Sequence, residues 1–449
     1  MEQKMTMSKS ENLTEKKLRL FLISVLAIFT SGLSFGLRGA IAGDVQALFL
    51  NPIDAANSAT LIGQILGVAF LGFSFTLFFG SPLVNIIGIG RMLQLAGVSF
   101  VAGTLITMFG PVLVEGDDIY WVFWIGMGLT GIGWGFTESA VNPLTTAIYP
   151  KDKTNRLNIL HAWWPAGIVV GGVASLGFDA IGVGWQVKFG IILIPTILFL
   201  LLIIGVKFPN TERVESGVKF TDMLAEITRR PSFVIWFFAM FLTAATELAP
   251  GQWVDITLSH TIGMPGIVIL IYISSLMFFM RHSAGFLSKY ISNTGLLLVS
   301  CILSAIGLYL LSQSVDPYSA IIASTLWGVG VSFLWPTMLA STSERFPRGG
   351  EFFLGLMGSA GSLSIYFVLP MMGSVFDTAK LTIAGGGDAF DALDGVALDN
   401  VLAKAAQISF QSAAIFPIIL VLVFSIIMLY EYRKKHAKTA ECFENTQNR

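Results

Sequence analysis

The sequence predicts an all-α membrane protein in which twelve transmembrane helices form two similar six-helix halves. Three observations support this prediction: a strongly apolar composition, twelve long apolar runs, and a charged segment that separates the runs into two sets of six. The basic residues of the connecting loops also concentrate on alternate loops, which is typical of a chain that crosses a bilayer repeatedly.

The composition is that of a membrane protein. Hydrophobic residues make up 54% of the 449 positions and charged residues only 12%, whereas a soluble domain carries about 25% charged residues. The mean hydropathy is +0.75. A net charge of −1 favours neither a nucleic-acid partner nor an acidic one, and the two cysteines, Cys301 and Cys442, imply no disulfide framework and no metal-ligand spacing.

Each apolar run is about 20 residues or longer, enough to cross a hydrocarbon core of roughly 30 Å. The twelve predicted spans lie near residues 18–42, 60–87, 91–112, 119–148, 156–178, 185–207, 232–260, 265–288, 295–314, 318–342, 351–376 and 406–430. The linkers expected on one side are rich in Lys and Arg, and those on the other side are mostly acidic, with Lys380 and Lys404 as the clear exceptions. The positive-inside rule therefore predicts that both termini lie in the cytoplasm.

The chain is expected to divide at its central charged segment. The predicted parts are a cytoplasmic tail at 1–17, a six-helix bundle at 18–207, a cytoplasmic linker at 208–231, a second bundle at 232–430 and a tail at 431–449. Two short echoes support a repeat: GIGWGF at 131–136 matches GVGVSF at 328–333, and the YP at 149–150 matches the FP at 346–347. Both pairs are offset by 197 residues, which suits two parallel bundles around a central cavity.

A long outside loop is expected at 377–405. Its central stretch, residues 384–400, is rich in Gly and Asp. Irregular structure or a short helix is the expected conformation. A calcium site is the less favoured alternative, because the spacing of the acids matches no calcium-binding loop.

Two motifs resemble a known family. GSPLVNIIGIGR, residues 80–91, resembles the loop between spans two and three that marks the major facilitator superfamily, with Asn85 where an aspartate is usual. ESAVNPLTTAIYP at 138–150, followed by RLN at 156–158, resembles the fucose–galactose–glucose:proton symporter family within it. The resemblance implies the major facilitator fold, with spans one, four and seven lining a cavity. That family has an acidic residue in its first span, where this chain has Gly39 next to Arg38.

Glu138 is a lone carboxylate in an apolar segment. A charge at the bilayer centre costs about 2.5–3.5 kcal/mol on insertion scales, so we expect Glu138 to face the cavity with a partner or a variable proton. Asn142 follows four residues later and shares a helix face with Glu138, and Pro143 can let the helix bend. The predicted role is coupling to a cation. The alternative is a structural ion pair that locks two helices.

Arg38 in span one and Glu247 in span seven extend this set, because the resemblance places their helices around the same cavity. If the three charges converge, Arg38 is expected to keep one carboxylate ionised while the other carries a proton. Alternatively, Arg38 binds an acidic substrate directly through a two-pronged contact. The coupling residues are therefore predicted to be Glu138 and Glu247.

Hydrogen-bonding and aromatic side chains in or near the spans supply the other candidates. The residues predicted to bind substrate are Arg38, Gln64, Asn142, Asn158, His161, Trp164, Gln252, Trp253 and Trp335. Arg281 and His282 are expected to form a gate or an interfacial anchor near the cytoplasmic end of span eight.

An enzyme is not expected, because the sequence contains no zinc, P-loop or C-x-x-C motif. The predicted function is secondary active transport of a monosaccharide or a related polyol across the inner membrane by alternating access, coupled to a proton or sodium. Two alternatives stay open: a carboxylate-bearing solute recognised by Arg38, and a receptor or scaffold on the same fold. No cofactor, metal or nucleic acid is expected, and the expected unit is a monomer in the lipid bilayer.

Overall fold

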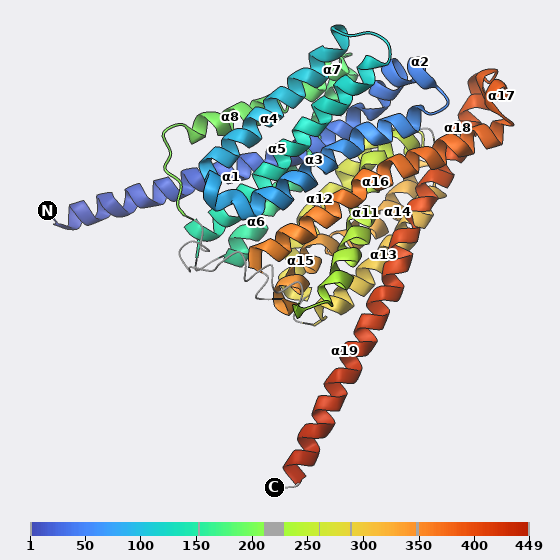
Figure 1. Ribbon diagram of the computed structural model, residues 1–449. Helices are drawn as coiled ribbons and strands as arrows, with labels where there is room; N and C mark the ends of the chain where they lie inside the picture. Colours follow the sequence, from blue (N-terminus) through green and yellow to red (C-terminus); the bar gives the residue numbers. More distant parts are fainter. Residues whose placement is uncertain are drawn as a thin grey trace.

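A computed structural model describes residues 2–150, 153–210, 229–259, 261–287, 290–346 and 350–447. Nearly all of them are helical (Figure 1). The helices are α1 (Glu2–Val45), α2 (Asn51–Asp54), α3 (Ser58–Ile87), α4 (Ile89–Phe109), α5 (Asp118–Ile148), α6 (Lys153–Ala180), α7 (Trp185–Gly190), α8 (Leu193–Ile203), α11 (Phe233–Leu258), α12 (Ile267–Leu287), α13 (Asn293–Ser312), α14 (Pro317–Val331), α15 (Leu334–Arg345), α16 (Gly350–Ala384), α17 (Gly387–Asp391), α18 (Gly395–Ala413) and α19 (Ile415–Gln447), with a π-helix at Gln46–Leu50 and a 3-10 turn at Gly110–Val112.

The predicted all-helical membrane fold is confirmed. In the described ranges, eleven helices are long and apolar enough to cross a membrane, and Ile267–Arg281 adds a shorter apolar stretch. Three of the twelve predicted spans are built from two consecutive helices each: the sixth from α7 and α8, the tenth from α14 and α15, and the twelfth from α18 and α19.

Two predicted boundaries differ from the structure. The expected outside loop at 377–405 is mostly helical: α16 continues to Ala384 and α18 begins at Gly395, with the short helix α17 between them. Gly385 and Gly386 make the turn after α16 with φ of 91° and 126°, a region of backbone conformation that favours glycine. The predicted tail after residue 430 continues α19 as far as Gln447. Most of the predicted linker, residues 211–228, lies outside the described residues.

Most contacts between the two halves of the described chain are made by three helix pairs. Helix α3 packs on α16, α1 on α11, and α6 on α12. The α3–α16 contact is close, because a Cβ at Gly63 would lie 2.6 Å from the backbone oxygen of Leu369. The bundle has two ends (Figure 1). We call the end with residues 203–210 and 229–233 the linker end, and the end with α2, α7 and α17 the far end.

The repeat suggested by the sequence extends to local geometry. Tyr149 ends α5 with φ −126° and ψ 57°, and Phe346, 197 positions later, ends α15 with φ −127° and ψ 57°. Each ring makes an edge-to-face contact with a phenylalanine of the first helix of its half, Tyr149 with Phe21 and Phe346 with Phe233. The two echoed segments therefore occupy similar environments.

The tenth span is interrupted between α14 and α15. Asp316 caps the start of α14, and the hydrogen bond from the Ser319 hydroxyl, together with those from the backbone N–H groups of Ser319 and Tyr318, holds the pKa of Asp316 below its usual range. Val331 ends α14, and Leu334 begins α15. A break inside a span leaves backbone groups that need other partners, and one such group lies in the candidate site.

Candidate functional site

Arg38 is the most deeply buried charged side chain at the centre of the first half. It lies on α1 and is 1% exposed. Its Nη1 donates to the Thr130 hydroxyl on α5 at 3.3 Å. Its guanidinium carbon lies 5.4 Å from the ring centre of Phe70 and 5.9 Å from that of Trp134. Aromatic faces stabilise a buried cation electrostatically, but they accept few of its hydrogen bonds.

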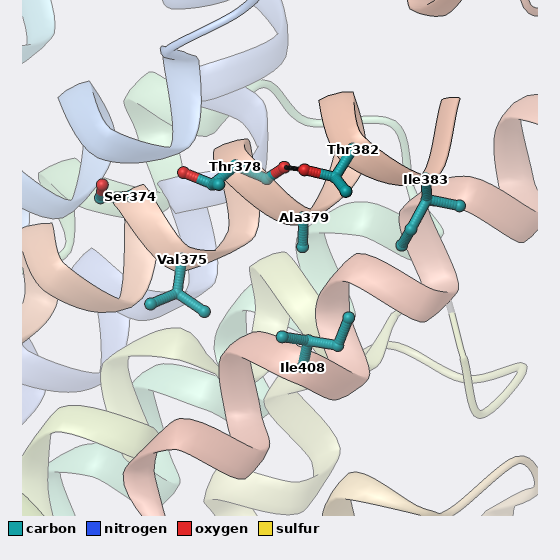
Figure 2. Close-up of a pocket in the computed structure, with 7 residues that line it drawn as sticks. All are labelled: Ser374, Val375, Thr378, Ala379, Thr382, Ile383 and Ile408. Carbon is teal, nitrogen blue, oxygen red and sulfur yellow. Dashed lines mark hydrogen bonds between the residues drawn. The ribbon is translucent and has the colours of Figure 1, made fainter. Parts of the chain in front are cut away.

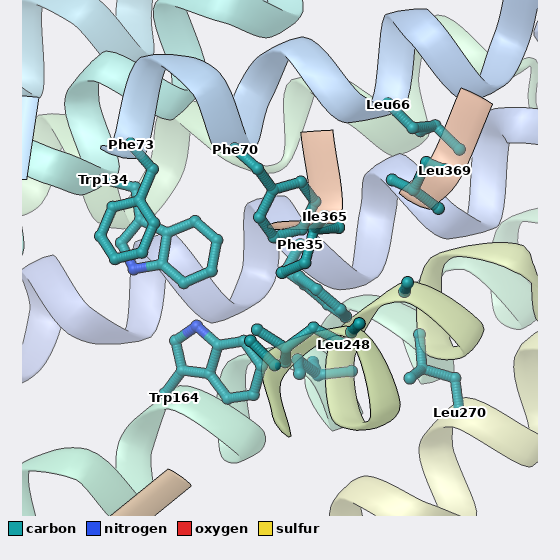
Figure 3. Close-up of a cluster of buried hydrophobic side chains, with 14 of the residues drawn as sticks. Phe35, Leu66, Phe70, Phe73, Trp134, Trp164, Leu248, Leu270, Ile365 and Leu369 are labelled. Carbon is teal, nitrogen blue, oxygen red and sulfur yellow. The ribbon is translucent and has the colours of Figure 1, made fainter. Parts of the chain in front are cut away.

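Phe70 and Trp134, the two rings beside this arginine, belong to a larger aromatic cluster, which is shown in Figure 3. Trp134 of α5 stacks on Phe73 of α3, with ring centres 4.3 Å apart, and on Trp164 of α6, with ring centres 5.9 Å apart. Phe35, one turn before Arg38 on α1, packs against Trp164. The second half of the chain contributes Leu248, Leu270, Ile365 and Leu369 to the same cluster. The cluster therefore joins helices of both halves.

Several buried polar atoms in this region have no hydrogen-bond partner within the described part of the chain. They are Nε and Nη2 of Arg38, the indole nitrogens of Trp134 and Trp164, and Oε1 of Gln252. In Figure 3 the two indole nitrogens lie on the facing sides of their rings. The Gln252 amide itself bridges the halves, because its Nε2 donates to the Phe35 backbone oxygen at 2.8 Å. Buried polar groups are nearly always paired, so this concentration of unpaired groups marks a candidate ligand site.

The expected pairing of Arg38 with Glu138 or Glu247 is wrong for this structure. None of the ion pairs within the described ranges includes Arg38. Glu247, which is buried on α11, instead binds Arg281 of α12 through an Oε1–Nη2 contact of 3.0 Å. Because Arg281 lies 34 residues from Glu247 on another helix, sequence spacing does not reveal this pair.

Arg281 also forms a hydrogen bond with the backbone at the interruption of the tenth span. Its Nε donates to the Ser332 backbone oxygen at 3.2 Å, and Ser332 lies between α14 and α15. Arg281 therefore connects Glu247 to the interrupted helix. The side chain of His282, predicted to act beside Arg281, lies outside what the structure describes.

Glu138 belongs to a second chain of polar groups. The Asn142 amide donates to Glu138 Oε2 at 3.0 Å, as the four-residue spacing predicts. His161 Nε2 donates to Asn142 Oδ1 at 2.9 Å, which links α6 to α5. All three side chains are half-buried. In the described residues Glu138 has no cationic partner, so the ion-pair alternative for this residue is not what the structure contains.

Three of the other predicted substrate-binding residues have contacts that the structure describes. Gln64 accepts a hydrogen bond from Tyr120 at 2.8 Å. Trp253 is fully buried and donates to the Ser409 hydroxyl of α18. Trp335 packs beside Gly361 of α16. Asn158 lies on α6, but its side chain is outside the described residues.

A charged contact at the far end was not predicted. Asp377 and Lys380 of α16 form a buried ion pair of 2.7 Å. Asp377 also accepts from the Thr60 backbone N–H and hydroxyl, both at 2.7 Å, and Lys380 donates to the Ala55 backbone oxygen at 2.7 Å. Their three-residue spacing near the end of an apolar run was the available sequence signal. We call this group the α16 latch, because it ties α16 to the start of α3.

A pocket on the second half lies between α16 and α18 (Figure 2). Its lining is mostly apolar and comprises Ser374, Val375, Thr378, Ala379, Thr382, Ile383 and Ile408. None of the predicted site residues belongs to it. The unpaired polar atoms around Arg38 are therefore the stronger indication of a ligand site.

Comparison with known proteins identifies the fold. A family model described as Major Facilitator Superfamily matches residues 20–368. No curated protein matches the sequence. Among solved structures, a D-xylose–proton symporter is 16% identical with a TM-score of 0.70, covering 89% of this chain and 97% of its own.

Two further solved structures resemble the chain over most of their length. The nucleoside transporter NupG is 13% identical with a TM-score of 0.66 and covers 92% of this chain and 99% of its own. The E. coli fucose:proton symporter FucP is 17% identical with a TM-score of 0.57 and covers 89% and 98%. At these identities the likeness concerns the fold.

Proposed function

Because the chain belongs to the major facilitator superfamily of secondary transporters, we propose that it carries a small hydroxylated solute of the monosaccharide or polyol class across the cell membrane together with a cation. The observation that supports this most strongly is the set of unpaired buried polar atoms inside an aromatic cluster. Sugar-sized solutes present hydroxyl groups to such atoms and apolar ring faces to aromatic side chains.

Alternating access would move the two halves, residues 18–207 and 232–430, against each other around this cluster. The contacts that must change are those of α3 with α16, α1 with α11, and α6 with α12. Opening toward the far end requires the α16 latch to break, because it binds α16 to the start of α3. The linker end would face the cytoplasm, as the basic linkers predict.

Glu138 is the proposed coupling residue. Its hydrogen-bond partner in the structure is the neutral Asn142 amide, and none of the ion pairs among the described residues includes Glu138. Binding and release of a proton can then accompany each transport cycle. Glu247 is the second candidate, but a proton on Glu247 would weaken its pair with Arg281 and with it the support of the interrupted tenth span.

The resemblance of residues 138–150 and 156–158 to the fucose–galactose–glucose:proton symporter family supports sugar and proton as the pair of substrates. Structural neighbours described as xylose–proton and fucose:proton symporters agree with this assignment at the level of the fold. A second candidate solute carries a carboxylate, and the unpaired Arg38 favours it.

Purified protein in liposomes tests the proposal. Labelled sugars, polyols and their acid derivatives are offered with an imposed pH or sodium gradient. We expect accumulation of at least one solute above its equilibrium level with one of the two gradients. If no solute in the panel is accumulated or exchanged by protein that retains its fold, a receptor or scaffold role replaces transport.

Orientation has its own test. Cysteines replace Ser10 and Asp391 one at a time in a background without Cys442, and intact cells are treated with an impermeant thiol reagent. The proposed topology, with both termini cytoplasmic, predicts reaction at position 391 and protection at position 10. The reverse pattern would invert the topology.

A further inference from the structure

We propose that Arg38 binds a carboxylate of the solute, so that the transported compound is a hydroxylated carboxylic acid, such as a sugar acid, rather than a neutral sugar. This inference rests on the proposed function, because it assigns the solute of the same site. It begins from the hydrogen bonds that Arg38 lacks. A guanidinium has five N–H donors and no acceptor, and only Nη1 is bonded, to Thr130, among the described residues.

The unpaired atoms have the geometry of a carboxylate site. Nε and Nη2 lie side by side on one edge of the planar guanidinium, and their two N–H groups form a fork that matches the two oxygens of a carboxylate. Both atoms are buried and without a partner in the described part of the chain. In Arg281, by contrast, the same edge of the guanidinium is bonded within the protein. Its Nε donates to the Ser332 backbone oxygen and its Nη2 donates to Glu247.

None of the ion pairs among the described residues supplies a negative charge to Arg38. Glu247 is bound to Arg281, and Glu138 accepts from Asn142. Phe70 and Trp134 lie against the guanidinium and stabilise its charge, but they offer no carboxylate. A buried charge without a counter-charge is unfavourable, and an anionic ligand would provide it.

The neighbouring unpaired groups indicate hydroxyls on the same ligand. The indole nitrogens of Trp134 and Trp164 are donors, and Gln252 Oε1 is an acceptor. A hydroxyl can satisfy either kind of group, since it is both donor and acceptor. A carboxylate together with hydroxyls on a small ring or chain offers a suitable partner to each of these kinds of atom.

Charge balance gives the proposal a further consequence. In the empty carrier, Arg38⁺ and Glu138⁻ sum to zero. In the loaded carrier, the solute carboxylate balances Arg38⁺, and the proton taken from one side neutralises Glu138 until it is released on the other. Glu247 and Arg281 stay paired in both forms. Neither the loaded nor the empty carrier then moves net charge, so an acid and a proton cross together electroneutrally.

Binding to matched pairs of solutes tests the assignment. Thermal unfolding of the purified protein is followed with glucose and glucuronate, galactose and galacturonate, and sorbitol and gluconate. We expect at least one acid to raise the melting temperature, while its neutral counterpart at the same concentration raises it less or not at all. Stabilisation by a neutral sugar with none by its acid would overturn the assignment while leaving the proposed transport function intact. No stabilisation by any solute, and no exchange of any in liposomes, would reject both.

Two substitutions locate the effect. Arg38→Gln removes the charge and is expected to abolish the acid-dependent shift. Arg38→Lys keeps the charge but removes the fork, and it is expected to weaken acid binding at least tenfold. The matched control is Arg19→Gln, which replaces an exposed arginine of the same helix by the same residue. This variant should bind the acid as the wild type does. If Arg38→Gln does not fold, Arg38→Lys and the wild-type panel still decide the question. Unchanged acid binding in Arg38→Lys would contradict the two-pronged contact.

Discussion

Arg38 and the α16 latch are both buried charged sites beside the contact between the two halves of the chain, yet they differ in how the chain completes them. In the latch, Asp377 is paired with Lys380 and accepts from the start of α3, and Lys380 also reaches the Ala55 oxygen. At Arg38, one hydrogen bond to Thr130 is the only one among the described residues. A charge completed by its own chain holds helices together. A charge left incomplete is available to a ligand.

Glu138 lies between these two extremes. Its carboxylate is bonded to Asn142, but that partner is neutral. The hydrogen bond positions the side chain, and the group that donates it carries no charge. The comparison therefore supports three proposed roles, which differ in the partner of each charge: structural contact for the latch, ligand binding for Arg38 and coupling for Glu138.

The largest expected effect comes from breaking the latch. Asp377→Ala leaves Lys380 buried without its counter-charge, and removal of one partner of a buried ion pair typically costs about 3–5 kcal/mol in the free energy of unfolding. Denaturation of the purified protein in detergent measures the loss. The double variant Asp377→Leu/Lys380→Met removes both charges and should recover part of it. A loss below about 1 kcal/mol in Asp377→Ala would mean that the latch is not a stabilising contact.

The coupling role of Glu138 predicts a split between two transport activities. Glu138→Gln keeps the shape and fixes the neutral form, so exchange of solute across the membrane should stay within about twofold of wild type, whereas uphill uptake driven by a pH step should be lost. Counterflow and gradient-driven uptake in the same liposomes make the comparison. If Glu138→Gln retains both activities, Glu247 becomes the coupling candidate. If it loses both, Glu138 acts in binding or folding, and acid-dependent thermal stabilisation distinguishes these.

Thr130 should have a smaller effect on solute binding. Thr130→Val preserves the size of the side chain and removes the one hydrogen bond that orients the guanidinium. A neutral hydrogen bond contributes about 0.5–1.5 kcal/mol, and one to a charged group somewhat more, so we expect acid affinity to fall by roughly threefold to tenfold. Titration of the acid against intrinsic tryptophan fluorescence measures this. An affinity equal to wild type would show that Thr130 does not position Arg38.

The smallest effect is expected on the stability of the empty protein when Arg38 is replaced by an apolar residue. Since none of the described carboxylates is paired with Arg38, Arg38→Met should change the free energy of unfolding by less than about 1.5 kcal/mol, in contrast to Asp377→Ala. Adding Glu138→Gln to Arg38→Met should recover nothing further. A large loss of unfolding free energy in Arg38→Met that Glu138→Gln reverses would instead indicate that Arg38 and Glu138 form an ion pair.

Much of the fold could be predicted from the sequence. The length and hydropathy of the apolar runs predict which segments are helical. The offset of 197 residues identified two helix ends with nearly the same backbone conformation, at Tyr149 and Phe346. The outside loop at 377–405 was predicted too long. Helices α16 and α18 both extend into it, because the polar residues at 384–400 interrupt the apolar pattern without interrupting the helices to the same extent. Charge and glycine content describe exposure to water better than they describe where a helix stops.

The sequence predicted which residues belong to the candidate site better than it predicted which residues they contact. Arg38, Glu138 and Glu247 were evident as rare charges in apolar spans. Their partners were not, because the rotation of each helix about its axis is set by packing with other helices. The hydrogen bond between Asp377 and Thr60 joins residues 317 positions apart. Neither this contact nor the Glu247–Arg281 pair corresponds to a periodic pattern in the sequence.

The most direct test of the account is the charge moved during transport. Proteoliposomes containing the wild-type protein are given an inward pH gradient and a potassium diffusion potential of either sign, and uptake of the acid that stabilises the protein most is recorded. Binding of the solute carboxylate by Arg38, with a proton on Glu138, predicts an initial rate that is the same at both potentials and no transport current. A rate that rises severalfold with the interior negative, or a current that accompanies uptake, would contradict the electroneutral pairing of acid and proton at this site.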